Sequence, residues 1–277
     1  MIQPGDIRAI AETVALAKDY VTANKLWKRI NAQYGIGAKQ GARFSLTAAD
    51  HKYLRDIVRN EYGFDPLKER PLDGELDRMS LAQKTRSEKL SGEEVGRDII
   101  LVSSGSGDLF LPQGDFTLPT GAVLQLQASA LHGAEEVVLV ENLSPMYHLH
   151  RYIWPEGMTQ IPMIFRGSPQ YSPAAVAKAL AGVRRVICFP DFDPQGLLNS
   201  FCTDNAGGLV IPTRSARSEL IRRGLDKPQD YTRQVEARDW LRKQKLGLEF
   251  VTDLLVSETG FSQESMVGLD LQVVDIP

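Results

Sequence analysis

Two stretches of sequence decide the fold: EEVVLVEN at 135–142 and RRVICFPDFDPQGL at 184–197. Each contains a short apolar run of the kind typical of a strand buried on both faces. A third such run, PMIFRG (162–167), and a helical segment, SPAAVAKALAG (172–182), lie between them, and GLVIP (208–212) follows. This alternation predicts an α/β fold in which helices flank a parallel sheet.

The N-terminal part has a different pattern. Apolar positions recur at helical spacing over 5–34, and a second helix is expected from Thr47 to near Gly63. Residues 76–90 are polar and charged, which favours a linker, and short β-rich pieces occupy 98–127. We therefore place a boundary near residue 95. It separates a mainly helical module (1–95), with a winged-helix-like fold as one candidate, from an α/β domain (96–277) that includes basic helices.

Composition narrows the class of protein. Of 277 residues, 43% are hydrophobic and 24% are charged, which is typical of a globular protein and excludes global disorder. No apolar run is long enough to cross a bilayer, and the N-terminus lacks the apolar stretch of a signal peptide. Two cysteines, Cys188 and Cys202, provide neither a disulfide framework nor a four-ligand zinc set. A cytoplasmic location is therefore expected.

The net charge of −3 conceals a strong segregation of charge. Residues 1–60 and residues 210–247 each carry ten Lys or Arg against five Asp or Glu, so each segment has a charge of +5. The segments 61–209 and 248–277 carry −7 and −6. Two basic regions flanking an acidic one could hold a polyanion beside a metal-dependent site. Solvated helix faces are the simpler interpretation of the charge alone.

Acidic residues follow two of the predicted strands. Glu141 ends the first, and Asp191 and Asp193 follow the second at a spacing that points both side chains the same way. If the strands are neighbours, the three carboxylates meet. At about 4 Å and an effective dielectric near 20, two like charges repel by roughly 4 kcal/mol, so such a cluster persists only if protons or a cation neutralise it. All-oxygen ligands favour Mg²⁺ or Mn²⁺.

Each of these residues also has a structural interpretation. Asp193 precedes Pro194, and Asp-Pro is an ordinary helix N-cap followed by proline in the first turn. Glu141 could be a surface acid at a strand end. Gly196 lies in a first helical turn, where it costs about 1 kcal/mol relative to Ala. That cost is understandable if the backbone must approach a metal or a phosphate closely.

Three pieces together resemble the Toprim domain, the metal-binding fold shared by topoisomerases, primases and several nucleases: VVLVEN (137–142), MIFRG (163–167) and ICFPDFDPQGL (187–197). DFDPQGL is especially similar to the corresponding stretch of the topoisomerase VI A subunit. VEN followed by the aspartate motif also resembles the Toprim nuclease subunit of Wadjet-type, condensin-like plasmid-defence systems. The clear resemblance covers residues 135–200, a quarter of the chain.

The resemblance implies that Glu141 assists proton transfer and metal binding, that Asp191 and Asp193 hold Mg²⁺ or Mn²⁺, and that Gly167 lies beside the site. FSQESM (261–266) is similar to a Gln-Glu pair near the end of the Wadjet-type nucleases, which makes Glu264 a further candidate. The topoisomerase relatives carry a catalytic tyrosine, and no tyrosine here has a matching context. We therefore expect metal-dependent hydrolysis of phosphodiesters rather than strand passage.

The basic segments are candidates for contacts with the DNA backbone. Those in the C-terminal half are Arg214, Arg217, Arg222, Arg223, Arg242 and Lys243, and those in the N-terminal module include Lys25, Lys28, Arg29, Lys39 and Arg43. The resemblance further implies a homodimer that acts with a condensin-like motor complex.

Two other classes of function are compatible with these residues. One is a non-catalytic, Toprim-derived subunit that binds DNA or a protein without cutting. The other is a glycosyltransferase that uses Asp-x-Asp to hold a metal–nucleotide sugar. The second is disfavoured, because it leaves Glu141 and Gly196 without a role.

Overall fold

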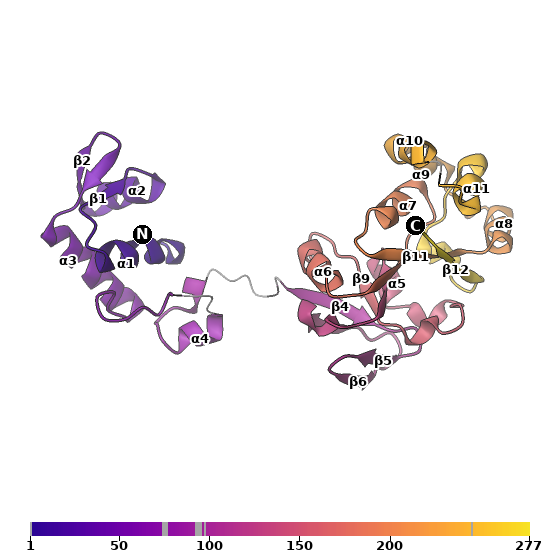
Figure 1. Cartoon of the computed structure of the whole chain (residues 1–277), viewed down its shortest axis with the longest axis horizontal. Helices are drawn as coiled ribbons and strands as arrows, with labels where there is room; N and C mark the ends of the chain where they lie inside the picture. The colour runs from indigo at the N-terminus through magenta and orange to yellow at the C-terminus, as the bar shows by residue number, and fades with distance from the viewer. Residues whose placement is uncertain (1, 74–76, 92–95, 97, 245) are drawn as a thin grey trace. The chain divides into compact units, whose positions relative to one another are not determined.

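The chain forms two compact units, Met1–Val95 and Gly96–Pro277, in a computed structural model that describes residues 2–73, 77–91, 96, 98–244 and 246–277 (Figure 1). Each unit has a hydrophobic core of its own. The predicted boundary near residue 95 lies outside the described residues, since 92–95 are not among them.

Short helices and a small sheet make up the described part of the first unit. The helices are α1 (Ile7–Ala15), α2 (Lys25–Tyr34), α3 (Ala48–Ile57) and α4 (Arg78–Ala82), with 3-10 segments at Pro4–Asp6 and Glu88–Ser91 and a π-helical turn at Val58–Tyr62. The strands β1 (Tyr20–Thr22), β2 (Ala38–Gln40) and β3 (Arg43–Ser45) form an antiparallel sheet in the order β1-β3-β2.

The helical spacing over 5–34 is interrupted in the structure. The helix ends at Ala15, Ala17 adopts a positive φ of 45°, and β1 follows. Val21 of β1 is buried and pairs with Phe44 of β3. A strand of three residues is too short to show an alternating pattern, so its single buried residue fits a helical period equally well. The expected helix end is present, because Gly35 closes α2 in the left-handed conformation.

The segment 76–90 is not a linker where the structure describes it. Leu81 of α4 and Leu90 are 1% and 8% exposed, and both belong to the core of the first unit. Between them, Gln83, Lys84, Arg86 and Lys89 are exposed. Two apolar residues among many charges give a weak signal in the sequence, which is why this segment resembles a linker.

The second unit is built on a seven-stranded mixed sheet in the order β12-β11-β10-β8-β9-β4-β7. The parallel centre comprises β11 (Ala206–Pro212), β10 (Arg185–Phe189), β8 (Glu136–Val140) and β9 (Met163–Phe165). The outer strands β12 (Leu271–Asp275), β4 (Ile99–Ser103) and β7 (Leu124–Gln127) run antiparallel to their neighbours. The predicted α/β fold is confirmed at this level, but the sheet is parallel only in its centre.

The connections explain the mixed sheet. Parallel neighbours require a crossover, and α6 (Pro173–Leu180) links β9 to β10 while α7 (Pro194–Phe201) links β10 to β11. The link from β4 to β7 instead contains an antiparallel hairpin of β5 (Asp108–Leu111) and β6 (Gly114–Thr117). Because no helical crossover separates β4 from β7, these two strands pair antiparallel.

The remaining helices gather near the C-terminal strands. They are α8 (Arg214–Arg222), α9 (Pro228–Arg233), α10 (Val235–Gln244) and α11 (Glu249–Ser257), and a short α5 (Leu143–Met146) follows β8. Figure 1 shows α7 to α11 grouped around β11 and β12. Residues 248–277 carried no predicted element, yet they supply α11, a 3-10 segment at Gln263–Met266 and β12.

Candidate active site at the ends of two parallel strands

Strands β8 and β10 are parallel neighbours whose last residues are in register, with Val140 opposite Phe189. The acidic residues lie just beyond this pair. The backbone N–H of Glu141 donates to the carbonyl oxygen of Phe189 at 3.1 Å, so the sheet pairing continues one residue further. The two chain segments that carry the predicted carboxylates therefore leave the same edge of the sheet side by side.

The carboxylate of Glu141 joins the two strand ends. Its Oε2 accepts a hydrogen bond from the backbone N–H of Asp191 at 2.9 Å, and its Oε1 lies 3.1 Å from a guanidinium nitrogen of Arg166. The side chain is only 11% exposed. Burial raises the pKa of Glu141, and the nearby charge of Arg166 acts in the opposite direction.

The carboxylate of Asp191 is held from two sides. Its Oδ1 accepts hydrogen bonds from the side-chain amide of Asn142 at 2.9 Å and from the backbone N–H of Gln263 at 2.8 Å. Burial raises the pKa of Asp191 despite these donors, and the charges of Asp193 and Glu264 add to the increase. A buried carboxylate close to other carboxylates is destabilising without a compensating charge.

Asp193 fills the capping role considered above, and does so with one oxygen. Its Oδ1 accepts from the backbone N–H of Gly196 at 2.7 Å, which caps α7. Its Oδ2 accepts from the side-chain amide of Gln234 at 2.8 Å. Burial also raises the pKa of Asp193.

The two glycines predicted to support the site are in tight surroundings. A Cβ on Gly196 would overlap the carbonyl oxygen of Asp191 and lie 3.1 Å from Oε2 of Glu141. Gly167 has a φ of +100°, and a Cβ there would lie 2.8 Å from the carbonyl oxygen of Tyr171. Close packing of backbone against the site therefore accounts for Gly196, and backbone conformation accounts for Gly167.

Of the predicted Gln-Glu pair, the glutamine contacts the site directly. Gln263 is fully buried; its Oε1 accepts from the backbone N–H of Asn142 at 2.8 Å, and its Nε2 donates to the carbonyl oxygen of Phe189 at 2.6 Å. Glu264 is exposed and acts on Asp191 only through its charge. An antiparallel bridge between Phe192 and Phe261 brings this distant segment to the site.

The sequence analysis missed four residues that contact the site: Asn142, Arg166, Gln234 and Gln263. Three of them stand directly beside a predicted residue, namely Glu141, Gly167 and Glu264, whereas Gln234 has no predicted neighbour. Their position next to a predicted site residue was the signal that the sequence offered for these three. Such a position does not show whether a side chain points into the site or away from it.

A pocket of about 340 Å³ opens on one side of Glu141, flanked by α6 and α7. Glu141 and Arg166 supply charge to its lining, and apolar residues such as Val176 and Leu180 line the α6 side. Cys188 also lines it, and burial raises the pKa of this thiol to about 11, so it is not a nucleophile at neutral pH. Asp191 and Asp193 do not line the pocket.

The three carboxylates are near one another but do not form a closed ligand set. Among the described residues, no group of three or more His, Cys, Asp or Glu side chains is arranged to hold a metal ion. Arg166 provides the positive charge beside Glu141 instead. The candidate metal ligands are all carboxylate oxygen atoms, which suits Mg²⁺ or Mn²⁺. In this structure, however, each carboxylate contacts its own protein partners and not a shared site.

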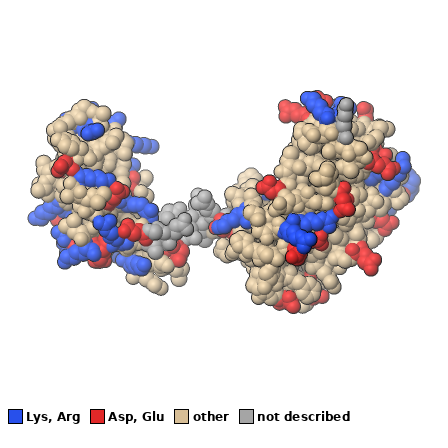
Figure 2. All heavy atoms as spheres, viewed as in Figure 1, with Lys and Arg blue, Asp and Glu red and all other residues tan. Residues whose placement is uncertain are grey.

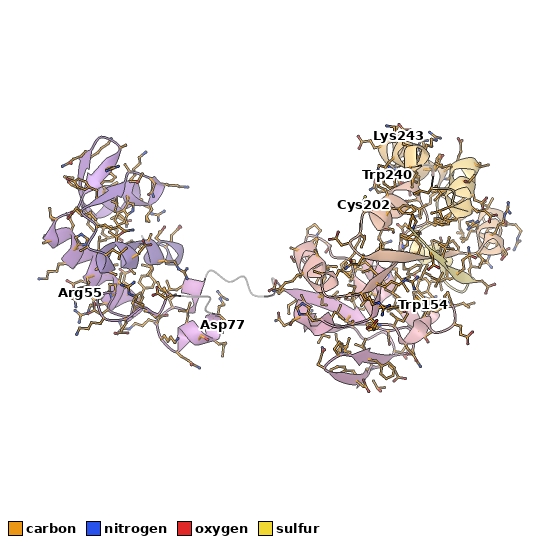
Figure 3. All side chains as sticks on the ribbon, in the orientation of Figure 1. Arg55, Asp77, Trp154, Cys202, Trp240 and Lys243 are labelled. Atoms are coloured by element: carbon orange, nitrogen blue, oxygen red, sulfur yellow. The ribbon has the colours of Figure 1, made fainter. Side chains whose placement is uncertain are left out.

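Most of the basic residues predicted to contact DNA in this unit are tied to acidic neighbours. Arg214 lies near Glu249 and Asp253, Arg222 and Arg223 both pair with Glu219, and Arg242 lies 3.5 Å from Asp239. Lys243 is exposed at the end of α10, the helix whose Trp240 packs on Phe201 of α7 (Figure 3).

Arg217 is a correction. It is 8% exposed, donates to Asp253 at 2.6 Å and to the carbonyl oxygen of Pro212 at 2.9 Å, and stacks over the ring of Phe192. Its guanidinium is enclosed within the unit, so we withdraw Arg217 from the predicted DNA contacts. The i, i+3 spacing of arginines on a helix does not reveal which of them faces the core.

The family model of a domain of unknown function (DUF7281) matches residues 97–273. The chain belongs to the DUF7281 family. The matched segment contains the seven-stranded sheet, except for the last two residues of β12, and every carboxylate of the candidate site. No curated protein and no solved structure matches this DUF7281 chain. None of the helices in its described residues has the length and apolar character needed to span a membrane.

Proposed function

We propose that the Gly96–Pro277 unit is a Toprim-like, Mg²⁺- or Mn²⁺-dependent DNA endonuclease that hydrolyses phosphodiesters. One observation carries the proposal: Glu141 and the Asp191–Asp193 turn leave adjacent parallel strands, and the Asp191 backbone is hydrogen-bonded to the Glu141 carboxylate. Burial raises the pKa of all three carboxylates, which is a frequent property of functional sites.

The carboxylate oxygens of the site are suitable ligands for Mg²⁺ or Mn²⁺. Their present arrangement, however, does not form a cation site. In the residues that the structure describes, no three acidic groups converge, and Arg166 occupies one oxygen of Glu141. The Arg166 side chain is 43% exposed, so it has room to leave Glu141 when a cation takes over its charge. A bound divalent cation would activate water and stabilise the leaving oxygen.

The chain's own residues have separable roles in this proposal. Glu141, with its pKa raised by burial, is the candidate proton acceptor, because a base works best when its pKa approaches the ambient pH. Asn142 and the backbone of Gln263 are positioning residues that hold the Asp191 carboxylate in one orientation. The homodimer, the condensin-like partner and the role in plasmid defence belong to the same proposal through the Toprim resemblance.

A second candidate is a non-catalytic, Toprim-derived subunit that binds DNA or a protein. The ion pair between Arg166 and Glu141 favours it, because the pair neutralises one site carboxylate without a metal. The hydrogen bonds from Gln263 to Asp191 and from Gln234 to Asp193 also favour this second candidate, because they satisfy both carboxylates within the unit.

Supercoiled plasmid incubated with the full chain and Mn²⁺ tests the first candidate. We expect nicking or linearisation that Asp191→Asn reduces by at least roughly 100-fold. Asp115→Asn is the matched control, because Asp115 is an exposed carboxylate on β6, away from the strand ends. Cleavage that survives Asp191→Asn would refute the site assignment.

Calorimetry separates the two candidates. Titration of the full chain with MnCl₂ should give binding heat that is absent from the Asp191→Asn variant. An absence of Mn²⁺ binding in the wild-type chain, together with intact plasmid, would leave the non-catalytic subunit as the better description.

A further inference from the structure

The two basic regions differ in how their charges are paired. The N-terminal basic segment, residues 24–52, contains six Lys or Arg and one Asp. Only Arg29 among the six forms an ion pair within the described residues, and its partner is Asp6. The other five are exposed: Lys25, Lys28, Lys39, Arg43 and Lys52. Figure 2 shows a few separate blue side chains over the part of this unit that contains α2 and the small sheet, and more of them over the lower part of the unit.

In the C-terminal basic region, residues 210–247, most of the described cations are paired. The arginines at 214, 217, 222, 223, 233 and 242 lie within ion-pair distance of an acidic side chain, whereas Lys227, Arg238 and Lys243 form no ion pair among the described residues. Phosphate groups would have to compete with these carboxylates. Exposed cations without an acidic neighbour carry the stronger field for a polyanion.

The β2–β3 hairpin presents its cations on both of its faces. Lys39 is directly opposite Phe44 in the antiparallel register, so the two side chains share a face, and Phe44 is buried on it. Arg43 precedes Phe44 and therefore projects from the other face. The tip consists of Gly41 and Ala42, both exposed and small. The hairpin, whose strand β3 is also paired with β1, therefore carries one positive charge on each face of the small sheet.

Helix α2 extends this positive surface and is fixed to the hairpin. Lys25 and Lys28 are three residues apart and lie on one side of the helix. The side-chain amide of Asn31 donates to the carbonyl oxygens of Ile36 and Gly37 at 3.0 and 2.6 Å, which ties the helix to the start of β2. The backbones of α2 and the hairpin are therefore fixed relative to each other before a ligand binds, so little backbone entropy is lost on binding.

We infer that α2 and the β2–β3 hairpin form a face that binds the backbone of duplex DNA. This deepens the proposed function, because it names the surface that holds the substrate. B-form DNA carries one negative charge per about 1.7 Å of axis, and its major groove admits an α-helix such as α2 with phosphates on either side. The major groove of duplex RNA is too deep and narrow for such an element.

Fluorescence anisotropy with a labelled synthetic DNA duplex tests this face in the full chain. Measurements in EDTA across a series of salt concentrations exclude metal-dependent cleavage. The variant K25Q/K28Q/K39Q/R43Q should bind at least roughly tenfold more weakly, and its slope of log affinity against log salt should be shallower by about 3–4, near 0.9 per lost contact. An RNA duplex of the same sequence should bind more weakly than DNA.

A rival variant removes the same number of charges from the C-terminal basic region: R214Q/R222Q/R223Q/R242Q. It should retain DNA affinity within about threefold, because those side chains are already paired. Equal losses in the two variants, or an unchanged affinity in the first, would overturn the inference, and so would equal binding of RNA. Matching thermal melts show that both variants are folded. Plasmid that stays uncut contradicts only the proposed nuclease, since this binding assay contains no metal.

Discussion

Lys28 on α2 and Arg222 on α8 are both exposed cations on short helices, yet their surroundings differ. Lys28 has no ion pair in the described part of the chain, whereas both Arg222 and its neighbour Arg223 bind Glu219. The regions around them have the same net charge of +5. Net charge therefore does not locate a binding surface, and the pairing of each cation decides whether its field reaches a ligand.

The same contrast extends to the acidic groups. In the Gly96–Pro277 unit, Glu141, Asp191 and Asp193 are largely withdrawn from solvent and held by amides, backbone N–H groups and one arginine. These three carboxylates are thus held inside the second unit, whereas the unpaired cations of the N-terminal basic segment lie on the surface of the first unit. Four substitutions probe this difference, and their expected effects decrease in the order given.

Arg217→Met should have the largest effect on folding. It leaves Asp253 without its closest partner and removes the stacking on Phe192, so the free energy of unfolding should fall by roughly 3 kcal/mol. Arg222→Gln, on the same helix, breaks an exposed pair and should cost less than about 1 kcal/mol. Urea unfolding followed by near-ultraviolet circular dichroism measures both. Similar losses would remove the distinction between enclosed and exposed arginines.

Gly196→Ala should follow, with a loss of roughly 2 kcal/mol. The added methyl group would overlap the Asp191 carbonyl oxygen and press on the Glu141 carboxylate, so the strand end must shift. Gly5→Ala in the first unit is the control, because no atom lies within 4 Å of a Cβ there. A Gly196→Ala protein as stable as the wild type would show that the site is looser than its contacts indicate.

Asp191→Asn should stabilise the metal-free protein at pH 7.5 by roughly 0.5–2 kcal/mol, the usual range for a stabilising change at a functional site. Burial raises the pKa of Asp191 in the folded state, so the folded protein binds more protons than the unfolded one. Stability is therefore lost as the pH rises from the ordinary value of 3.8 through the raised pKa.

Thermal melts in EDTA at several pH values measure this effect. The advantage of Asp191→Asn should shrink as the pH falls through the raised pKa of Asp191 towards the ordinary value of 3.8, because the wild-type carboxyl takes up a proton over that range. A constant difference across the pH range would mean that the Asp191 charge does not destabilise the fold.

Lys39→Gln should have the smallest effect on stability, within about 0.5 kcal/mol, because its exposed side chain makes no ion pair among the described residues. Its salt slope for DNA should nevertheless be shallower by about 0.9. Thermal melting and anisotropy on the same preparation measure the two quantities. A large loss of stability would mean that Lys39 is part of the fold and not of the binding face.

The central strands and their carboxylates could be predicted because the relevant information is local. Runs such as VVLV (137–140) and VICF (186–189) bury every side chain, and the residue after each run necessarily stands at the edge of the sheet. The i, i+2 spacing of Asp191 and Asp193 was equally visible. What could not be predicted was that Asp193 directs its two oxygens to Gly196 and Gln234.

The contribution of Gln263 could not be predicted for the opposite reason. It lies 121 residues after Asn142 in the chain, and it reaches the site because Phe261 bridges to Phe192 and β12 pairs with β11. Pairing over such a distance depends on the whole sheet being assembled. A short local stretch such as FSQESM (261–266) therefore does not show that this segment pairs with a distant part of the chain.

The sequence by itself determined the α/β class of the second unit, the apolar strands at its centre and the residues that stand at their ends, because burial and periodicity act over a few neighbouring positions. Tertiary structure alone decided which strands are neighbours, that Arg166 faces Glu141, and which arginines are already paired. Those features arise from contacts between segments far apart in the chain, and such contacts form only when the fold is complete.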